Sequence, residues 1–393
     1  METPRLATSA DIARAAEVAA SSGRIGVDTE FMSEGRYRPL LCLVQVAVAG
    51  NGDRSDILLI DPLADEALLR PIAGAVADPQ IEVVVHAGRQ DIAILRRVCQ
   101  IEVRNVFDTQ VAGGFAGSSA QTGYGNLVAA MLGQQVGKTA SYTRWDTRPL
   151  SGEQLRYAAE DVVHLLPLAD ELKRRLREGG RLQWAEEECR RLEAASDERD
   201  PESAWERLPR INQLDPRARA IARALAAWRE RTAAETDRPV GSVLADQVLV
   251  EVARRRPQST AELAHIRGVH RSTLNRRGPS ILEAVARGLR DPPIPRERSG
   301  PRAEAADGPV IALVEAWLRA RALEVGLAYE LIASRAELEA LIGAARRAEP
   351  EPPVRALTGW REQLVGADLR NLVAGNGAVA VGEDLRLRLV GET

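Results

Sequence analysis

The sequence predicts an α/β domain with a mixed sheet flanked by helices, followed by all-α helical bundles. Three short apolar segments follow one another closely before residue 61, which favours strands. Strand-like and helix-like patterns then alternate as far as about residue 150, and mainly helical spacing of apolar residues follows. Because 393 residues exceed one ordinary core, we expect domains at 1–195, 202–290 and 309–393, with a linker at 291–308.

The first domain is expected to begin with an antiparallel meander, because only short turns separate its first three strands. These strands are predicted at 24–28, 40–49 and 56–60. Further on, helices are predicted at 64–77 and 90–99, and strands at 82–86 and 105–107. Such alternation is typical of crossovers that return to the same sheet. Ser151, with Gln154 three residues later, predicts a capped helix that continues to Lys173.

The remaining chain is expected to be helical, with one interruption. Residues 291–308 contain four prolines and no periodicity, which predicts the linker. Beyond it, helices are predicted at 310–329, 336–345 and 360–374. Because the regions 202–290 and 309–393 are of similar length and both helical, we expect the second to be a degenerate copy of the first.

The charge is unevenly distributed along the chain. The net charge is −3, but residues 202–290 carry 17 arginines and 10 acids, so this region is +7 and the remainder −10. An acidic region that holds cations beside a basic region that holds phosphates is a coherent pairing. The alternative is a compositional preference for arginine on solvated helix faces, since Lys138 and Lys173 are the only lysines.

Composition also excludes several classes of protein. The three cysteines, Cys42, Cys99 and Cys189, fit neither a disulfide framework nor a zinc site, so we expect reduced thiols and a cytoplasmic location. No basic segment followed by an apolar run begins the chain, and no stretch of about 18 apolar residues occurs. We therefore expect neither a signal peptide nor a membrane partner.

Asp28 and Glu30 form the strongest local signal for chemistry. They end an apolar strand at positions i and i+2, and such residues share one face of a strand. Two neighbouring carboxylates repel each other unless a cation binds between them, and Mg²⁺ and Mn²⁺ prefer such hard oxygen ligands. The alternative is a pair of surface acids at the end of a strand.

Two further elements add acids. Asp91 follows His86-Ala87-Gly88 in the first turn of a helix, where an acid is favoured by the helix dipole alone. Tyr157 and Asp161 stand at i and i+4, so a phenol and a carboxylate share one face of a later helix. Taken alone, Asp91 is explained by the helix dipole, and the pair of Tyr157 and Asp161 is unremarkable for a helix.

The ordered set resembles the DEDD exonucleases, and Tyr157 places it in the branch with a tyrosine. The flanking residues resemble the ribonuclease D family over residues 24–290. The matching motifs are Asp28-Thr29-Glu30-Phe31, Arg38 to Gln45, Ile60 to Leu63, His86-Ala87-Gly88 and Tyr157 to Val162. One departure is Arg144 before Trp145, where the family often has an acid.

The resemblance implies an RNase H-like exonuclease domain and 3′–5′ hydrolysis of RNA with release of 5′-mononucleotides. It also implies two divalent ions, Mg²⁺ or Mn²⁺, held by Asp28, Glu30, Asp91 and Asp161, with one ion activating water. Tyr157 would orient that water, since a phenol of ordinary pKa is a poor base. Phe31, His86 and Lys138 are further candidates for contacts with the substrate.

Residues 205–289 resemble the HRDC domain, a helical bundle often used as a platform for nucleic acid. Arg254, Arg255, Arg267 and Arg271 could contact phosphates there, with a solvated arginine-rich surface as the alternative. Gly133 to Thr139 imitates a P-loop but is one residue short, so no nucleotide cofactor is expected. Asp108, which follows a predicted strand, is expected to cap a helix.

These inferences predict a cytoplasmic, monomeric 3′–5′ exoribonuclease that processes RNA ends such as those of tRNA precursors. The choice of RNA rests on the resemblance, because nothing in the sequence recognises a 2′-hydroxyl. A DNA exonuclease for repair is the first alternative. A catalytically inactive RNA-binding scaffold is the second, and the presence of all four acids and Tyr157 argues against it.

Overall fold

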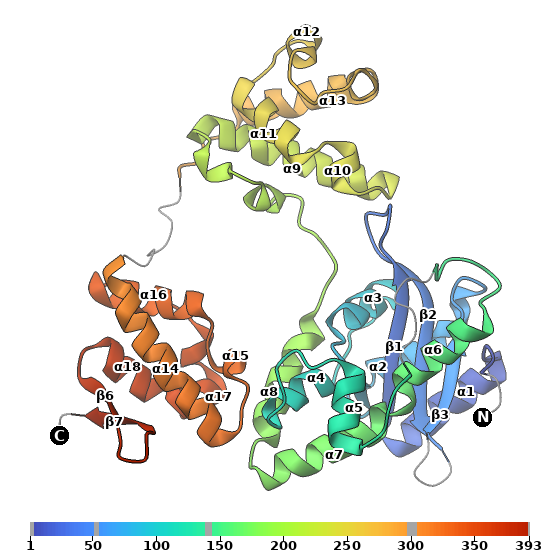
Figure 1. The fold of residues 1–393 in the computed structure, drawn as a ribbon. Helices are drawn as coiled ribbons and strands as arrows, with labels where there is room; N and C mark the ends of the chain where they lie inside the picture. Colours follow the sequence, from blue (N-terminus) through green and yellow to red (C-terminus); the bar gives the residue numbers. More distant parts are fainter. Residues whose placement is uncertain (1–3, 51–54, 138–143, 297–304, 392–393) are drawn as a thin grey trace. The chain divides into compact units, whose positions relative to one another are not determined.

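The computed structural model describes residues 4–50, 55–137, 144–296 and 305–391 (Figure 1). The chain forms two compact units, and both are discontinuous in sequence. The first unit comprises Met1–Glu30, Leu41–Ser196 and Gly300–Thr393, and the second comprises Phe31–Leu40 and Asp197–Ser299. The expected domain boundaries at 195, 202, 290 and 309 stay predictions.

A five-stranded mixed sheet organises the first unit, in the order β3-β2-β1-β4-β5. The strands are β1 Arg24–Met32, β2 Leu40–Ala49, β3 Ser55–Ile60, β4 Glu82–Val85 and β5 Val106–Asp108. β2 pairs with β3 antiparallel, whereas β1, β4 and β5 are parallel. The predicted mixed sheet is therefore confirmed, although β1 extends past Asp28 to Met32.

Helices flank this sheet. They are α1 Ser9–Ser22, α2 Arg70–Ala77, α3 Arg89–Cys99, α4 Thr109–Phe115, α5 Tyr124–Leu132, α6 Gly152–Val163, α7 Leu165–Glu178 and α8 Leu182–Arg190. The single helix predicted up to Lys173 is wrong, because the chain breaks at His164 between α6 and α7. Pro167 explains the break, since it cannot donate a hydrogen bond to residue 163 and its ring would clash with that carbonyl.

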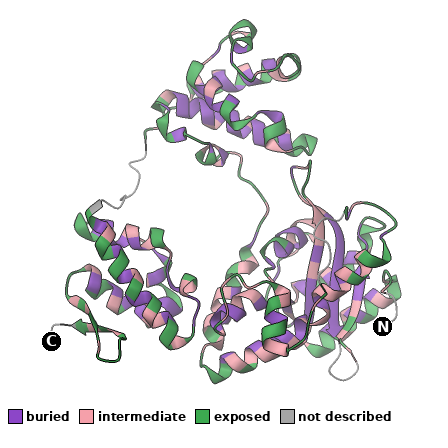
Figure 2. Cartoon of the chain, viewed as in Figure 1, coloured by how far each residue is buried: buried purple, intermediate pink, exposed green. Residues whose placement is uncertain are grey.

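The core of the first unit lies on the sheet (Figure 2). Nearly every residue of β2 is buried, and α7 packs closely over β1 at Gly26. A Cβ atom at Gly26 would lie 3.2 Å from the Cβ of Ala47 and 3.4 Å from that of Leu165. Glycine at this position therefore lets α7 approach the strand that carries the first two acids.

The C-terminal region adds a second set of helices to this unit. They are α14 Gly308–Val325, α15 Tyr329–Ile332, α16 Arg335–Arg346, α17 Gly359–Arg361 and α18 Ala367–Val373, with a π-helical turn at Glu362–Gly366. Two strands that were not predicted, β6 Gly377–Val381 and β7 Leu387–Gly391, form an antiparallel hairpin. The predicted helices at 310–329, 336–345 and 360–374 correspond to α14, α16 and the α17–α18 stretch.

Trp360 and Arg361 join this C-terminal region to the α4 and α8 helices. The Trp360 ring lies between Trp184, stacked at 5.5 Å, and Phe115, edge-on at 5.0 Å. Arg361 is fully buried, and its guanidinium lies 2.8 Å from the carboxylate of Glu188. The buried residues of both regions consequently belong to one continuous hydrophobic core.

The second unit is a bundle of five helices with its own core. They are α9 Pro216–Thr236, α10 Val240–Val243, α11 Asp246–Arg255, α12 Thr260–Ala264 and α13 Arg271–Arg290. The segment Phe31–Leu40 belongs to this unit, and Tyr37 anchors it. The Tyr37 hydroxyl donates a 2.8 Å hydrogen bond to Glu230 on α9, and both side chains are buried.

Candidate active site

The predicted acids gather at the edge of the sheet where its parallel strands end. Residue Gly26 of β1 pairs with Val84 of β4, and Val85 pairs with Asp108 of β5, so the ends of all three strands are in register. Asp28 and Glu30 lie on the last part of β1. Asp91 lies in the first turn of α3, directly after the turn that follows β4.

Burial and neighbouring acids raise the pKa values of Asp28 and Glu30. Burial raises the pKa of Asp28 well above its ordinary value, and the charges of Asp91, Asp161 and Glu30 raise it further. Burial and the charges of Asp161 and Asp91 raise the pKa of Glu30 to about 8. Burial also raises the pKa of Asp161, to about 7. Mutual repulsion of this kind is relieved when a cation binds.

Tyr157 and Asp161 share one face of α6, as their spacing predicts. The Tyr157 hydroxyl donates a hydrogen bond to the Asp161 carboxylate. Burial, together with the charges of Asp161 and Glu30, raises the pKa of Tyr157 above its ordinary value. The phenol therefore keeps its proton at neutral pH, which suits it to donate a hydrogen bond and not to act as a base.

The loop before α6 packs against Tyr157. Trp145 is buried, and its ring lies 6.0 Å from that of Tyr157. Arg148 fixes this loop: it makes two 2.6 Å hydrogen bonds to the buried carboxylate of Asp61 and one of 2.7 Å to the Trp145 carbonyl. Arg144, which departs from the family pattern, forms an ion pair with Asp146 at 2.8 Å.

Thr29 contributes a contact that sequence reasoning missed. Its hydroxyl donates a short hydrogen bond to the Asp91 carboxylate, and both side chains are buried. Alternation along a strand places Thr29 on the face opposite to Asp28 and Glu30, so spacing alone does not associate it with the acids.

The donor set fits a divalent cation. Four carboxylates offer the hard oxygen atoms that Mg²⁺ and Mn²⁺ select. Burial raises the pKa values of all four, and the charges of the other acids raise those of Asp28 and Glu30 further. In the described ranges, no three acid, histidine or cysteine side chains already stand in a complete coordination geometry.

The remaining predicted contact residues lie in several places. His86 is half-buried beside the site, 2.9 Å from the Thr109 hydroxyl, and burial lowers its pKa to about 4. Phe31 is half-buried and begins the segment that belongs to the second unit. Lys138 lies outside the described residues.

The four predicted phosphate-binding arginines are all exposed on the second unit. Arg254 and Arg255 on α11 form ion pairs with Glu251, whereas Arg267 precedes α13 and Arg271 begins it.

Tyr124 is another neighbour of the acids that was not predicted. Its hydroxyl accepts a 3.0 Å hydrogen bond from the His164 backbone N–H at the break between α6 and α7. Its ring lies edge-on to that of His86, with 5.5 Å between the ring centroids, and burial together with the charges of Asp161 and Asp28 raises the pKa of Tyr124. Tyr124 forms part of no recognised motif, so the sequence carried no signal for it.

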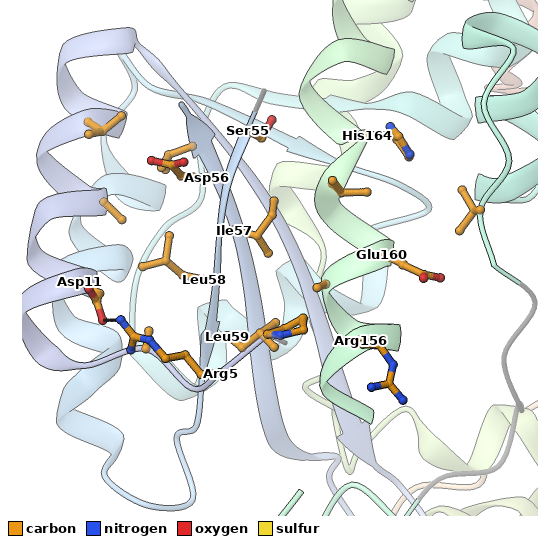
Figure 3. Close-up of a pocket in the computed structure, with 18 of the residues that line it drawn as sticks. Arg5, Asp11, Ser55, Asp56, Ile57, Leu58, Leu59, Arg156, Glu160 and His164 are labelled. Carbon is orange, nitrogen blue, oxygen red and sulfur yellow. Dashed lines mark ion pairs between the residues drawn. The ribbon is translucent and has the colours of Figure 1, made fainter. Parts of the chain in front are cut away.

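A cavity of about 840 Å³ lies between α1, β3 and α6 and contains none of the four acids (Figure 3). Arg156 and Glu160 of α6 line it, together with His164, which follows that helix. Tyr157 and Asp161 are absent from its walls, so this hollow is separate from the carboxylate cluster.

Comparison with protein families gives two matches along the chain. Residues 5–177 match the model of a 3′–5′ exonuclease domain, and this range contains all four acids and Tyr157. Residues 218–285 match the HRDC domain, within the region expected at 202–290. Among the described residues, no helix is long and apolar enough to cross a membrane.

Relatives and solved structures match most of the chain. Ribonuclease D of Granulibacter bethesdensis is 40% identical over 370 residues, covering 92% of this chain and 89% of the relative. Ribonuclease D of Gluconacetobacter diazotrophicus is 36% identical over 364 residues, with the same shares covered. The crystal structure of Escherichia coli RNase D, an exoribonuclease involved in structured RNA processing, superposes with a TM-score of 0.79 at 29% identity. That superposition covers 95% of this chain and 99% of the other.

Proposed function

The chain belongs to the ribonuclease D family, and on this premise we propose that it shortens RNA from the 3′ end at the carboxylate cluster of its first unit. It is a hydrolytic 3′–5′ exoribonuclease. The observation that carries the site assignment is the placement of Asp28 and Glu30 on β1 beside Asp161 of α6, whose charge adds to burial in raising the pKa of Glu30 to about 8. Asp91 completes the set from α3.

Asp28, Glu30, Asp91 and Asp161 would hold two divalent cations, Mg²⁺ or Mn²⁺. When bound, such a pair lowers the pKa of a water molecule and stabilises the leaving 3′ oxygen. Tyr157 keeps its proton and orients the attacking water through its hydroxyl. Trp145 and Arg148 hold Tyr157 in place from the preceding loop. Release of 5′-mononucleotides follows from attack on the last phosphodiester bond.

Removal of one ligand tests this assignment. We expect Asp28→Asn to lower Mn²⁺-dependent degradation of a short single-stranded RNA by more than about 100-fold, because substitutions even outside the ligand set cost 10- to 100-fold. Glu153→Gln is the matched control, since Glu153 is exposed in the first turn of α6. Unchanged degradation by Asp28→Asn would refute the assignment.

The exposed arginines of the second unit are proposed to bind the RNA backbone. The logarithm of the affinity falls linearly with the logarithm of the salt concentration. For a single strand, each phosphate contact that is removed makes this slope shallower by about 0.7. The double variant Arg267→Ala with Arg271→Ala should therefore bind RNA more weakly and with a shallower slope. Arg290→Ala, at the opposite end of α13, is the control. An unchanged slope in the double variant would exclude these two arginines.

The preferred substrate is proposed to be a structured RNA with a 3′ extension, such as a tRNA precursor. Supporting this proposal, the Escherichia coli relative acts in structured RNA processing. Digestion of a 3′-extended tRNA beside a plain single-stranded RNA and a matched DNA decides the point. Trimming that stops near the mature tRNA end supports the proposal, whereas faster digestion of DNA would favour the repair alternative.

We also propose that the enzyme works as a monomer in the cytoplasm. The three cysteines are free thiols, which agrees with a reducing compartment. Light scattering of the purified chain measures its oligomeric state directly.

A further inference from the structure

Asp108 is a buried acid beside the active site that the proposed chemistry does not use. It stands at the end of β5 and is 1% exposed. As predicted, it caps α4, accepting hydrogen bonds from the backbone N–H groups of Gln110 at 2.8 Å and Val111 at 3.3 Å. It also accepts from the N–H groups of Ala87 at 3.1 Å and Gly88 at 2.9 Å.

These two additional hydrogen bonds hold the turn that leads to Asp91. Ala87 has a φ of 52°, a left-handed conformation that costs energy for any residue with a Cβ atom. Gly88 leaves no room for a side chain, because a Cβ atom there would lie 2.5 Å from the Cβ of Val85. Such a turn persists only when its surroundings determine it. α3 begins directly after this turn, with Asp91 as its third residue.

Asp108 is itself poorly placed to bind a cation. Its Oδ1 atom accepts from three backbone N–H groups, and its Oδ2 atom accepts from Gly88. Cys189 of α8 packs against Asp108, with its sulfur 3.3 Å from the Asp108 backbone nitrogen. Thr109 adds a second brace on the same turn, because its hydroxyl donates to the Val85 carbonyl at 3.0 Å.

We propose that Asp108 is a positioning residue that sets the place of Asp91 by clamping the strained turn at Ala87 and Gly88. This proposal rests on the proposed role of Asp91 as a metal ligand. The clamp couples two loops that follow neighbouring strands, so that one carboxylate fixes the start of α4 and the start of α3 together. Asp108 acts on the metal site without touching metal or RNA.

Substitution of Asp108 by asparagine tests the clamp. The amide nitrogen replaces one accepting oxygen by a donor, so at least one backbone N–H of the turn loses its partner. We expect the full-length Asp108→Asn protein to bind Mn²⁺ at least about 10-fold more weakly than the wild type. Losses of about 10- to 100-fold are typical when a residue that holds a metal ligand in place is replaced. Calorimetric titration without RNA measures this affinity independently of catalysis.

Kinetics supply a second readout. With Asp108→Asn, kcat should fall at limiting Mn²⁺ and recover toward the wild-type value at saturating Mn²⁺, while KM for a short RNA stays unchanged. Asp65→Asn is the matched control, because Asp65 also caps a helical turn, at Ala67, but lies away from the acids in sequence and is exposed. The control should bind Mn²⁺ as the wild type does.

The possible results separate the clamp from the site assignment. A folded Asp108→Asn protein with wild-type Mn²⁺ affinity would overturn the clamp. Should that variant fail to fold, the same titration is made with Ala87→Gly and with Ala87→Gly/Asp108→Asn, because glycine adopts the turn without strain. Weaker Mn²⁺ binding by the double variant supports the clamp, and equal binding overturns it. Wild-type Mn²⁺ affinity in Asp91→Asn would instead overturn the metal-site assignment, and the clamp with it.

Discussion

The two helical regions of the chain are alike in length, yet they are built into the molecule differently. Residues 202–290 form the main part of the second unit, and the buried residues of its core, as far as the structure describes them, lie between Ala204 and Val285. Residues 309–393 share a single core with the exonuclease region, through Trp360, Phe115 and their neighbours. Helical content and length therefore do not indicate whether a region is an independent body; the destination of its large buried side chains does.

The largest test of this difference is the removal of Trp360. Because its ring fills the space between Trp184 and Phe115, Trp360→Ala should destabilise the first unit by about 3–5 kcal/mol. Scanning calorimetry, together with an assay of the exonuclease activity that remains after heating, should show that the first unit melts at a lower temperature. Leu249→Ala, a fully buried position in the other core, should lower the second unit alone. Loss of stability in the second unit after Trp360→Ala would contradict the shared core.

The buried ion pair gives the next largest effect. Arg361→Met removes the buried cation beside Glu188 and leaves the more exposed Arg191, 3.2 Å away, as that carboxylate's cationic partner; breaking a buried pair costs about 3 kcal/mol. Glu188→Gln combined with Arg361→Met should recover most of that loss. Arg370→Met is the control, because Arg370 and its partner Glu351 are each more than 40% exposed, and such pairs contribute little. Denaturant titration followed by activity measures all three variants.

Substitution of Tyr37 tests the stability of the second unit. Tyr37→Phe removes the hydrogen bond to Glu230 and leaves a buried carboxylate with one partner fewer, which costs about 1–3 kcal/mol. The calorimetric transition of the second unit should move to lower temperature, while that of the first stays in place. A shift in the first transition instead would show that residues 31–40 stabilise the exonuclease unit.

The last comparison is the response of the two units to pH. The folded-state pKa of Glu30, about 8, lies above its unfolded value near 4.5, so the folded first unit binds more protons between these values. Without metal, that unit should lose stability as pH rises from about 5 to 8, and Glu30→Gln should flatten the trend. Asp215 of the second unit has a lowered pKa, so its contribution is lost only in acid. Melting in EDTA at pH 5.5 and 8 distinguishes the two.

Local patterns predicted most of the sheet and the elements that carry the acids, whereas the roles of those acids came from the family resemblance and stay a prediction. β2 lies at the predicted residues, and Asp91 stands in the first turn of its helix, because strand alternation and helix capping are encoded locally. Thr29, Asp108 and Tyr124 acquire their roles through contacts between distant segments, which no spacing reveals. The break at His164 was missed because helical periodicity continues across it, although Pro167 was visible.

The order in which the chain builds its two units has a topological consequence. The polypeptide passes from the first unit to the second at residue 31, returns at 41, leaves again at 197 and returns at 300. Neither unit is a continuous segment, so neither can be excised with a single cut. A protease that nicks the chain near residue 197 leaves the bundle covalently joined to the first unit at residue 300, and a nick near residue 299 leaves it joined at residue 197. This connectivity keeps the helical bundle attached to the first unit after one backbone break.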